Sequence, residues 1–156
     1  MVVSGLVLNF VPDPAAAMAE ARRVFAPGGL AAAYVWDYAG GMEMMRHFWD
    51  AAAVLDPAAA ALDEGRRFPR REPAALERPF RGAGMERVGV PTPFVSFDDY
   101  WLPLLGGQGP VPGYAVSLGE AARDRLREEV RRWLQVASDG SIGVTARAWA
   151  VLGVAG

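Results

Sequence analysis

Short apolar runs alternate along the chain with helical patterns and turn signals, an order that predicts an α/β fold. The β-branched start Val2-Val3-Ser4 predicts a strand. The apolar character continues over residues 5–10, which are expected to form strand, a turn or a short helical piece. A helix then begins at Asp13-Pro14, because aspartate caps helix N-termini and proline fits the first helical position. This helix extends to about Phe25, and a Pro-Gly-Gly turn ends it.

Residues 30–36 form a nearly all-apolar run, which predicts a central strand of a parallel sheet covered on both faces. The strand–helix–strand order is that of a right-handed βαβ unit. Asp37 and Tyr38 then follow the carboxyl end of the second strand. Open α/β sheets bind their ligands at this edge.

Helices are predicted downstream over residues 41–55, from Asp56-Pro57 to residue 65, and over 73–81. Residues 66–71 form an arginine-rich connector, interpreted as a solvated stretch or as a contact for an acidic substrate. Residues 86–97 predict an edge strand that Pro91 and Pro93 break.

The last third of the chain predicts a loop, a helix and a strand. Residues 98–114 are rich in proline and glycine and are expected to form a loop. Ser117 and Glu120 predict a capping box for a helix to about residue 135, with Trp133 on its buried side. A final strand is expected over residues 141–152.

Composition excludes several classes of function. A single domain is expected for 156 residues, and a net charge of −2 argues against a nucleic-acid partner. The chain has no cysteine and no lysine, so zinc thiolate sites and Schiff-base chemistry are absent. No apolar run approaches a membrane span, and we expect a cytoplasmic protein without a membrane partner. The Ala/Arg/Gly-rich bias is typical of a GC-rich bacterial genome.

Residues 4–29, SGLVLNFVPDPAAAMAEARRVFAPGG, resemble a motif of class I S-adenosylmethionine (SAM)-dependent methyltransferases, as in a methyltransferase type 11-like domain. The motif comprises the end of the fourth strand, an Asp-Pro helix start, a Glu-x-x-Arg-Val helix end and a Pro-Gly-Gly turn into the fifth strand. Residues 81–88 are similar to the family's Ala-Gly turn into the sixth strand, and residues 142–152 would be the seventh.

The resemblance implies a partial Rossmann-like fold with strands equivalent to 4-5-7-6 and flanking helices. Within residues 1–156, the Gly-rich turn and the acidic residues that hold SAM in the family are not found. We therefore expect a single, N-terminally truncated methyltransferase domain whose cofactor-binding half is missing. Three strands with their helices, at roughly 30 residues per βα unit, would make up that half. Val2 and Val3 would then lie on an exposed sheet edge, which favours self-association.

The resemblance also implies that Ser4, Gly5 and Leu6 line the methionine end of SAM, although ordinary strand-end packing is the alternative. Asn9 would either orient a substrate or cap a turn. Trp36, Asp37 and Tyr38 lie at the ligand edge, where Asp37 is a candidate catalytic residue or an N-cap. His47, the single histidine, is a candidate general base or a structural residue.

Residues 98–114 are interpreted as a substrate-side loop in which Asp98, Tyr100 and Trp101 belong to an aromatic lid. Asp98 and Asp99 alone are a weak metal signal, and no metal site is predicted.

These observations predict a SAM-dependent methyltransferase with a small-molecule acceptor, of which this chain is a fragment whose own activity is open. Methyl transfer from SAM needs mainly alignment and desolvation, so a strong catalytic constellation is not required. The alternative is a non-catalytic interaction or dimerisation module derived from a methyltransferase. An unrelated α/β hydrolase-like fragment is excluded because the chain has no G-x-S-x-G elbow.

Overall fold

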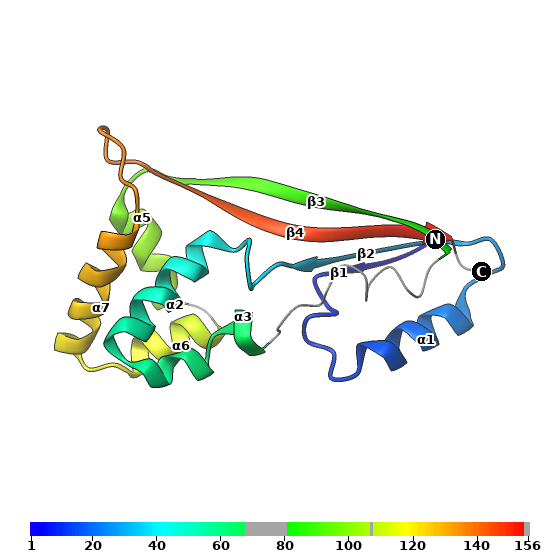
Figure 1. Cartoon of the computed structure of the whole chain (residues 1–156), viewed down its shortest axis with the longest axis horizontal. Coiled ribbons are helices and arrows are strands. Elements are labelled where there is room, and N and C mark those ends of the chain that lie inside the picture. Colours follow the sequence, from blue (N-terminus) through cyan, green and yellow to red (C-terminus); the bar gives the residue numbers. More distant parts are fainter. Residues whose placement is uncertain (68–80, 107, 155–156) are drawn as a thin grey trace. The chain divides into compact units, whose positions relative to one another are not determined.

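A computed structural model of the chain (Figure 1) describes residues 1–67, 81–106 and 108–154. Almost all of the predicted helix over 73–81 and most of the connector over 66–71 lie outside these residues. The chain divides into two compact units. The strand unit comprises Met1–Asp37, Arg70–Gly89 and Arg147–Gly156, and the helical unit comprises Tyr38–Pro69 and Val90–Ala146.

The sheet has the strand order that the resemblance implies. Its strands are β1 (Val2–Gly5), β2 (Leu30–Trp36), β3 (Arg81–Phe94) and β4 (Ile142–Val154), in the order β1-β2-β4-β3. β1 runs parallel to β2, whereas β4 is antiparallel to β2. This mixed sheet reproduces the order 4-5-7-6 and confirms the predicted partial Rossmann-like fold, with β3 as an edge strand. The predicted break of that strand is wrong, because β3 continues through Pro91 and Pro93.

Helix α1 (Pro14–Val24) begins and ends where the sequence predicts. The Asp13 carboxylate accepts a hydrogen bond from the Ala16 amide at 2.9 Å, which satisfies one of the free N–H groups of the first turn. Gly28 then adopts a φ of 73°, a conformation that favours glycine, and the chain enters β2. The strand–helix–strand unit is thus set by local signals.

Coverage of β2 on both faces was a wrong prediction. Ala31, Ala33 and Val35 are buried against a small core that includes Leu8, whereas the alternate residue Tyr34 is 41% exposed. An all-apolar strand has the same sequence whether one or both faces are covered. The pattern therefore identified the strand but not its burial.

Helices make up most of the helical unit (Figure 1). They are α2 (Glu43–Leu55), the 3-10 helix η1 (Pro57–Ala61), α3 (Glu64–Arg67), α5 (Phe97–Trp101), the 3-10 helix η2 (Leu102–Leu105), α6 (Pro110–Ser117) and α7 (Glu120–Trp133). The Asp56 cap is confirmed, although a 3-10 turn and a short helix replace the single helix predicted up to residue 65. No helix in the described ranges is long and apolar enough to cross a bilayer.

The loop predicted over residues 98–114 is largely helical, so that prediction was wrong. The Ser96 hydroxyl accepts a hydrogen bond from the Asp99 amide at 3.1 Å and caps α5. Pro103 and Pro110 stand in the first turns of η2 and α6, where a missing N–H costs nothing. Prolines that suggested a loop therefore start helices.

The capping box predicted for α7 is also absent. Gly119 is the N-cap and makes no side-chain cap bond, and the Ser117 hydroxyl donates to the Tyr114 carbonyl at 2.7 Å. The Arg123 guanidinium instead donates to the Ala115 and Leu118 carbonyls at 3.0 and 2.8 Å, which ties α7 to the end of α6.

The buried side of α7 carries Leu126 and Val130. Trp133, expected on that side, is 43% exposed, and its indole N–H donates to Glu129 at 3.2 Å. The helix ends at this residue, so the core contact passes to the next one, Leu134, which is buried.

Two glycines of the helical unit should respond in opposite ways to alanine. A Cβ at buried Gly65 would lie 3.0 Å from the Tyr38 carbonyl oxygen and 3.1 Å from the Ala39 Cα, both backbone atoms. Gly65→Ala is expected to lower the free energy of unfolding by about 1–3 kcal/mol through overpacking. A Cβ at Gly113, inside α6, meets open space, so Gly113→Ala should raise it by about 0.5–1 kcal/mol. Urea unfolding measures both, and equal shifts would contradict this packing.

Candidate functional site

Ser4, Gly5 and Leu6 lie at the carboxyl end of β1. Ser4 and Gly5 pair with Ala33 and Tyr34 of β2, and the Leu6 amide donates to the Tyr34 carbonyl at 2.8 Å. Leu6 has a φ of 58°, the one positive φ among the described non-glycine residues. This left-handed conformation costs about 1–2 kcal/mol for an L-residue, so β1 ends on a strained turn.

Gly5 allows a close approach within the strand unit. A Cβ built on Gly5 would lie 2.6 Å from the Cζ atom of Tyr34, which is inside van der Waals contact. The Tyr34 phenol therefore occupies the space beside the end of β1 that a side chain at position 5 would need. The glycine is thus explained by packing against Tyr34.

The side chain of Asn9 bonds to the backbone of β2, a contact that the sequence did not predict, and its substrate role stays a prediction. It is 2% exposed, its amide nitrogen donates to the Trp36 carbonyl at 3.2 Å, and its amide oxygen accepts from the Trp36 amide at 3.1 Å. One side chain thus satisfies both backbone groups of Trp36, as a further residue of β1 would do in the ladder. Asn9 continues the pairing of β1 with β2 after the chain has turned away.

Asp37 follows β2 and forms an ion pair with Arg147 of β4. Its Oδ2 atom accepts from Nε and Nη2 of Arg147 at 2.7 and 2.5 Å, and its amide donates to the Arg147 carbonyl at 3.0 Å. The N-cap of the next helix is Met42, so Asp37 is not that cap. The paired carboxylate is held in a fixed orientation at the carboxyl end of β2.

Arg147 is the site residue that the sequence reasoning missed. Its guanidinium carbon also lies 5.5 Å from the centroid of the Trp149 ring, within cation–π range. The sequence contained a signal for it, because Arg147 is the one charged residue in a largely apolar strand. Its partner was not predictable, since Asp37 lies 110 positions away in the sequence.

The structure divides the predicted site residues between the two units. Ser4, Gly5, Leu6, Asn9, Trp36 and Asp37 belong to the strand unit, and Tyr38, His47, Asp98, Tyr100 and Trp101 belong to the helical unit. His47 is half-buried on α2. Tyr38 is half-buried as well; burial, and secondly the charge of Glu64, raises the pKa of its hydroxyl. The catalytic role of His47 stays a prediction.

The three residues assigned to a substrate-side lid make contacts within the helical unit. Tyr100 and Trp101 are 0% and 3% exposed in the main core, and the Tyr100 hydroxyl donates to the Met44 carbonyl at 2.6 Å. Burial strongly raises the pKa of the Tyr100 hydroxyl. Asp98 is exposed and forms an ion pair with Arg127 at 2.6 Å. Among the described residues, no group of three or more acidic or histidine side chains could hold a metal ion.

A buried polar cluster joins α2 to the segment that begins α3. Arg46 forms a bidentate ion pair with Asp63. The Glu64 carboxylate accepts a hydrogen bond from the Trp49 indole N–H at 2.6 Å. Asp63 and Glu64 are 5% and 4% exposed. Burial, more than any neighbouring group, raises the pKa of Glu64. Sequence reasoning missed this cluster, although two adjacent carboxylates after an apolar helix were a visible signal.

The raised pKa of Glu64 makes stability depend on pH. The folded chain holds the Glu64 proton above the unfolded pKa of about 4.5. The contribution of Glu64 to stability is therefore greatest below that value and falls as pH rises through the folded pKa. Glu64→Gln keeps an acceptor for Trp49 but does not titrate. Relative to wild type, this variant should gain stability as pH rises from 4 to 7, by at most about 1.4 kcal/mol per pH unit. Urea unfolding at several pH values measures the difference; a constant difference would contradict the assignment.

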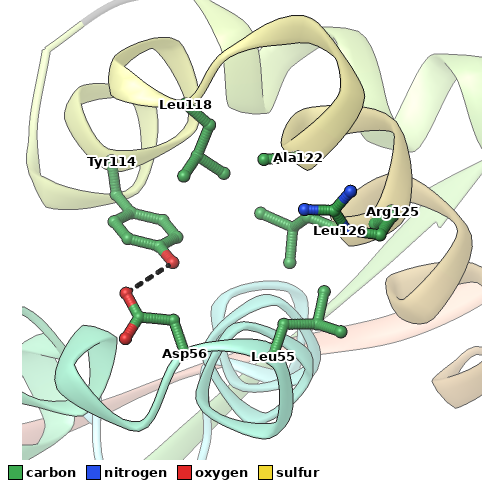
Figure 2. Close-up of a pocket in the computed structure, with 7 residues that line it drawn as sticks. All are labelled: Leu55, Asp56, Tyr114, Leu118, Ala122, Arg125 and Leu126. Atoms are coloured by element: carbon green, nitrogen blue, oxygen red, sulfur yellow. Dashed lines mark hydrogen bonds between the residues drawn. The ribbon is translucent and has the colours of Figure 1, made fainter.

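A cavity of about 190 Å³ lies between the end of α2 and the helices α6 and α7 (Figure 2). Its apolar lining consists of Leu55, Leu118, Ala122 and Leu126. Its polar lining consists of Asp56, Tyr114 and Arg125. The Tyr114 hydroxyl donates to the Asp56 carboxylate at 3.3 Å (Figure 2). Of the predicted substrate-side segment over residues 98–114, Tyr114 lines this cavity, and the named candidate site residues do not.

The comparisons with known proteins bear on the N-terminal segment. Residues 1–33 match the family model described as "Methyltransferase domain". The curated proteins include no match to the chain. One similar solved structure, of a candidate methyltransferase from Bacillus halodurans C-125, is 12% identical at a TM-score of 0.41. The match covers 99% of this chain and 63% of that one, so this chain spans less than two thirds of its length.

The matched segment contains β1, α1 and the first residues of β2. It includes the residues 4–29 on which the sequence resemblance depends. The resemblance is thereby confirmed for this segment, since residues 1–33 are similar to the methyltransferase domain family.

Proposed function

We propose that the chain is part of a SAM-dependent methyltransferase that acts on a small molecule, in the cytoplasm. The observation that carries this proposal is the methyltransferase-domain match over residues 1–33, which contains the end of β1. Ser4, Gly5 and Leu6 would hold the methionine end of SAM there. The sheet order β1-β2-β4-β3 supports the same assignment.

The backbone conformation at the end of β1 supports a binding site for one end of such a cofactor. The left-handed Leu6 turns the chain away directly after the strand, and strain of this kind is concentrated at binding sites. SAM, when bound, supplies a methyl group already activated by a positively charged sulfur. The chain's own contribution would be orientation of the acceptor, for which Asp37, held by Arg147, offers a fixed carboxylate.

Photolabelling with SAM tests this assignment. Ultraviolet irradiation of the full chain with radiolabelled SAM should attach label to the peptide that contains Ser4–Leu6, and S-adenosylhomocysteine should compete. Label on a peptide of the helical unit, or label that a competitor does not reduce, would contradict the proposed place of the cofactor.

A second candidate function is an interaction module that pairs through β1. β1 is the end strand of the sheet, and Val2 and Val3 are 43% and 53% exposed. Unpaired backbone groups on such a strand can pair with a second copy of the chain. Sedimentation should then show a dimer that Val2→Lys dissociates; a monomeric wild type would exclude this function.

A further inference from the structure

We propose that the cavity of the helical unit binds a small zwitterion with an apolar side chain, of the class of the free aliphatic amino acids. This inference is independent of the proposed methyl transfer. It rests on the size of the cavity, on the two opposite charges that line it, and on the apolar surface between them (Figure 2).

The size and lining suit a side chain of about the size of leucine. An apolar cavity of about 150 Å³ takes up a benzene molecule, and this one has about 190 Å³. Leu126 is 1% exposed and forms its base, whereas Leu55 is 44% exposed and Arg125 is also exposed. The cavity therefore leads from the surface at Leu55 and Arg125 down to an apolar base.

Asp56 supplies the anionic end. Its Oδ1 atom caps η1 by accepting from the Ala58 amide at 3.0 Å, and its Oδ2 atom accepts the Tyr114 hydroxyl at the long distance of 3.3 Å. A carboxylate has about four acceptor sites, so capacity for an ammonium group remains. Burial, and secondly the Asp56 charge, raises the pKa of Tyr114, which keeps this hydroxyl a donor.

Tyr114 holds one wall of the cavity rigid. Its ring centroid lies 5.7 Å from that of Trp49 and 6.3 Å from that of Phe48, both buried in the main core. The ring therefore cannot collapse into the cavity without breaking these contacts. An ammonium group at Asp56 would also lie beside the ring.

Arg125 supplies the cationic end. Its guanidinium extends over the cavity from α7, on the side opposite Asp56 (Figure 2). In the described part of the chain, Arg125 makes no hydrogen bond or ion pair, whereas Arg127 and Arg132 of the same helix both have carboxylate partners. A guanidinium with free N–H donors binds a carboxylate through two parallel hydrogen bonds, in a bidentate geometry. The pair Asp56 and Arg125 thus matches the two charges of an amino acid.

Calorimetric titration of the full chain with leucine tests the proposal. Isopentylamine and 4-methylpentanoate are the matched probes, because each keeps the apolar part and lacks one of the two charges. Leucine should bind saturably and at least about tenfold more tightly than either probe, since each lost pairing removes a charge-assisted hydrogen bond. No saturation by about 10 mM leucine, or equal affinity for either probe, would overturn the proposal.

Two variants locate the site without loss of the fold. Asp56→Asn keeps a good N-cap, and Arg125→Gln keeps a good helix former, so both should remain folded by circular dichroism. Each should weaken leucine binding about tenfold or more. Asp98→Asn, which makes the same change at an exposed carboxylate outside the cavity, should leave it unchanged. Leucine binding that neither cavity variant weakens would place it elsewhere and overturn the assignment.

Discussion

Tyr100→Ala is expected to lower the free energy of unfolding by about 3–5 kcal/mol, the cost of a large cavity in a packed core. Tyr100 is 0% exposed, and its ring lies 5.3 Å from that of Phe94 and 6.1 Å from that of Phe97. The substitution also removes the partner of the Met44 carbonyl. Urea unfolding followed by circular dichroism measures the loss.

Trp133→Ala provides the matched control in the same unit. Its indole is 43% exposed and is bonded to Glu129 at the surface, so the expected loss is below about 1 kcal/mol. A Tyr100→Ala variant as stable as wild type would show that Tyr100 lies outside the core. Comparable losses at both positions would contradict the burial described for α5 and α7.

Asp63→Ala should have a comparably large effect for an electrostatic reason. The variant leaves the Arg46 guanidinium without its counter-charge, and the Arg46 side chain is only 18% exposed. The Nε atom of Arg46 already has no hydrogen-bond partner among the described residues. Removal of one member of a buried pair costs about 3–5 kcal/mol. Asp63 also accepts the Gly65 amide at 2.7 Å, and this bond is lost too.

Asp98→Ala serves as the control, because it breaks an exposed ion pair. Asp98 is 65% exposed in its pair with Arg127, and solvent and salt screen such pairs to about 0–1 kcal/mol. Chemical unfolding of both variants in the same buffer compares the two ion pairs directly. If Asp98→Ala were the more damaging of the two, the burial of the Arg46–Asp63 pair would be refuted.

Local signals explain why much of the strand unit was predictable. The Asp13 cap, the Pro-Gly-Gly turn and the apolar run over 30–36 each act within a few residues, and the structure follows them closely. The strand order came from the resemblance of residues 4–29, not from these signals. The exposure of one face of β2 was not predictable, since coverage depends on segments distant in the chain.

The sequence did not predict the helices in the segment where proline and glycine are frequent. Between residues 98 and 114, prolines in first turns and the Ser96 cap produce three short helices from a sequence typical of a loop. The sequence assigns the aromatic residues there to a lid because it predicts a loop over this segment. Once the segment is helical, Tyr100 and Trp101 reach the core.

The candidate site was predictable in position but not in contacts. Placing Asp37 at the carboxyl end of β2 needed only the strand boundary, and the structure confirms that boundary. Its pairing with Arg147, and the bonds of Asn9 to Trp36, depend on pairs 110 and 27 residues apart. Contacts at such separations arise from sheet order and register, which no local pattern contains.

Isothermal titration of SAM into the full chain, with circular dichroism to verify folding, tests the central claim most directly. The account predicts weak binding, with a Kd on the order of 1 mM, because the Gly-rich turn and the acidic residues that hold SAM in the family are not found within residues 1–156. Ser4→Phe should abolish this binding, because a bulky side chain would block the end of β1, and Asp98→Asn should leave it intact. A folded chain that does not bind SAM, or one that binds it equally well as Ser4→Phe, would contradict the claim that the end of β1 holds the cofactor.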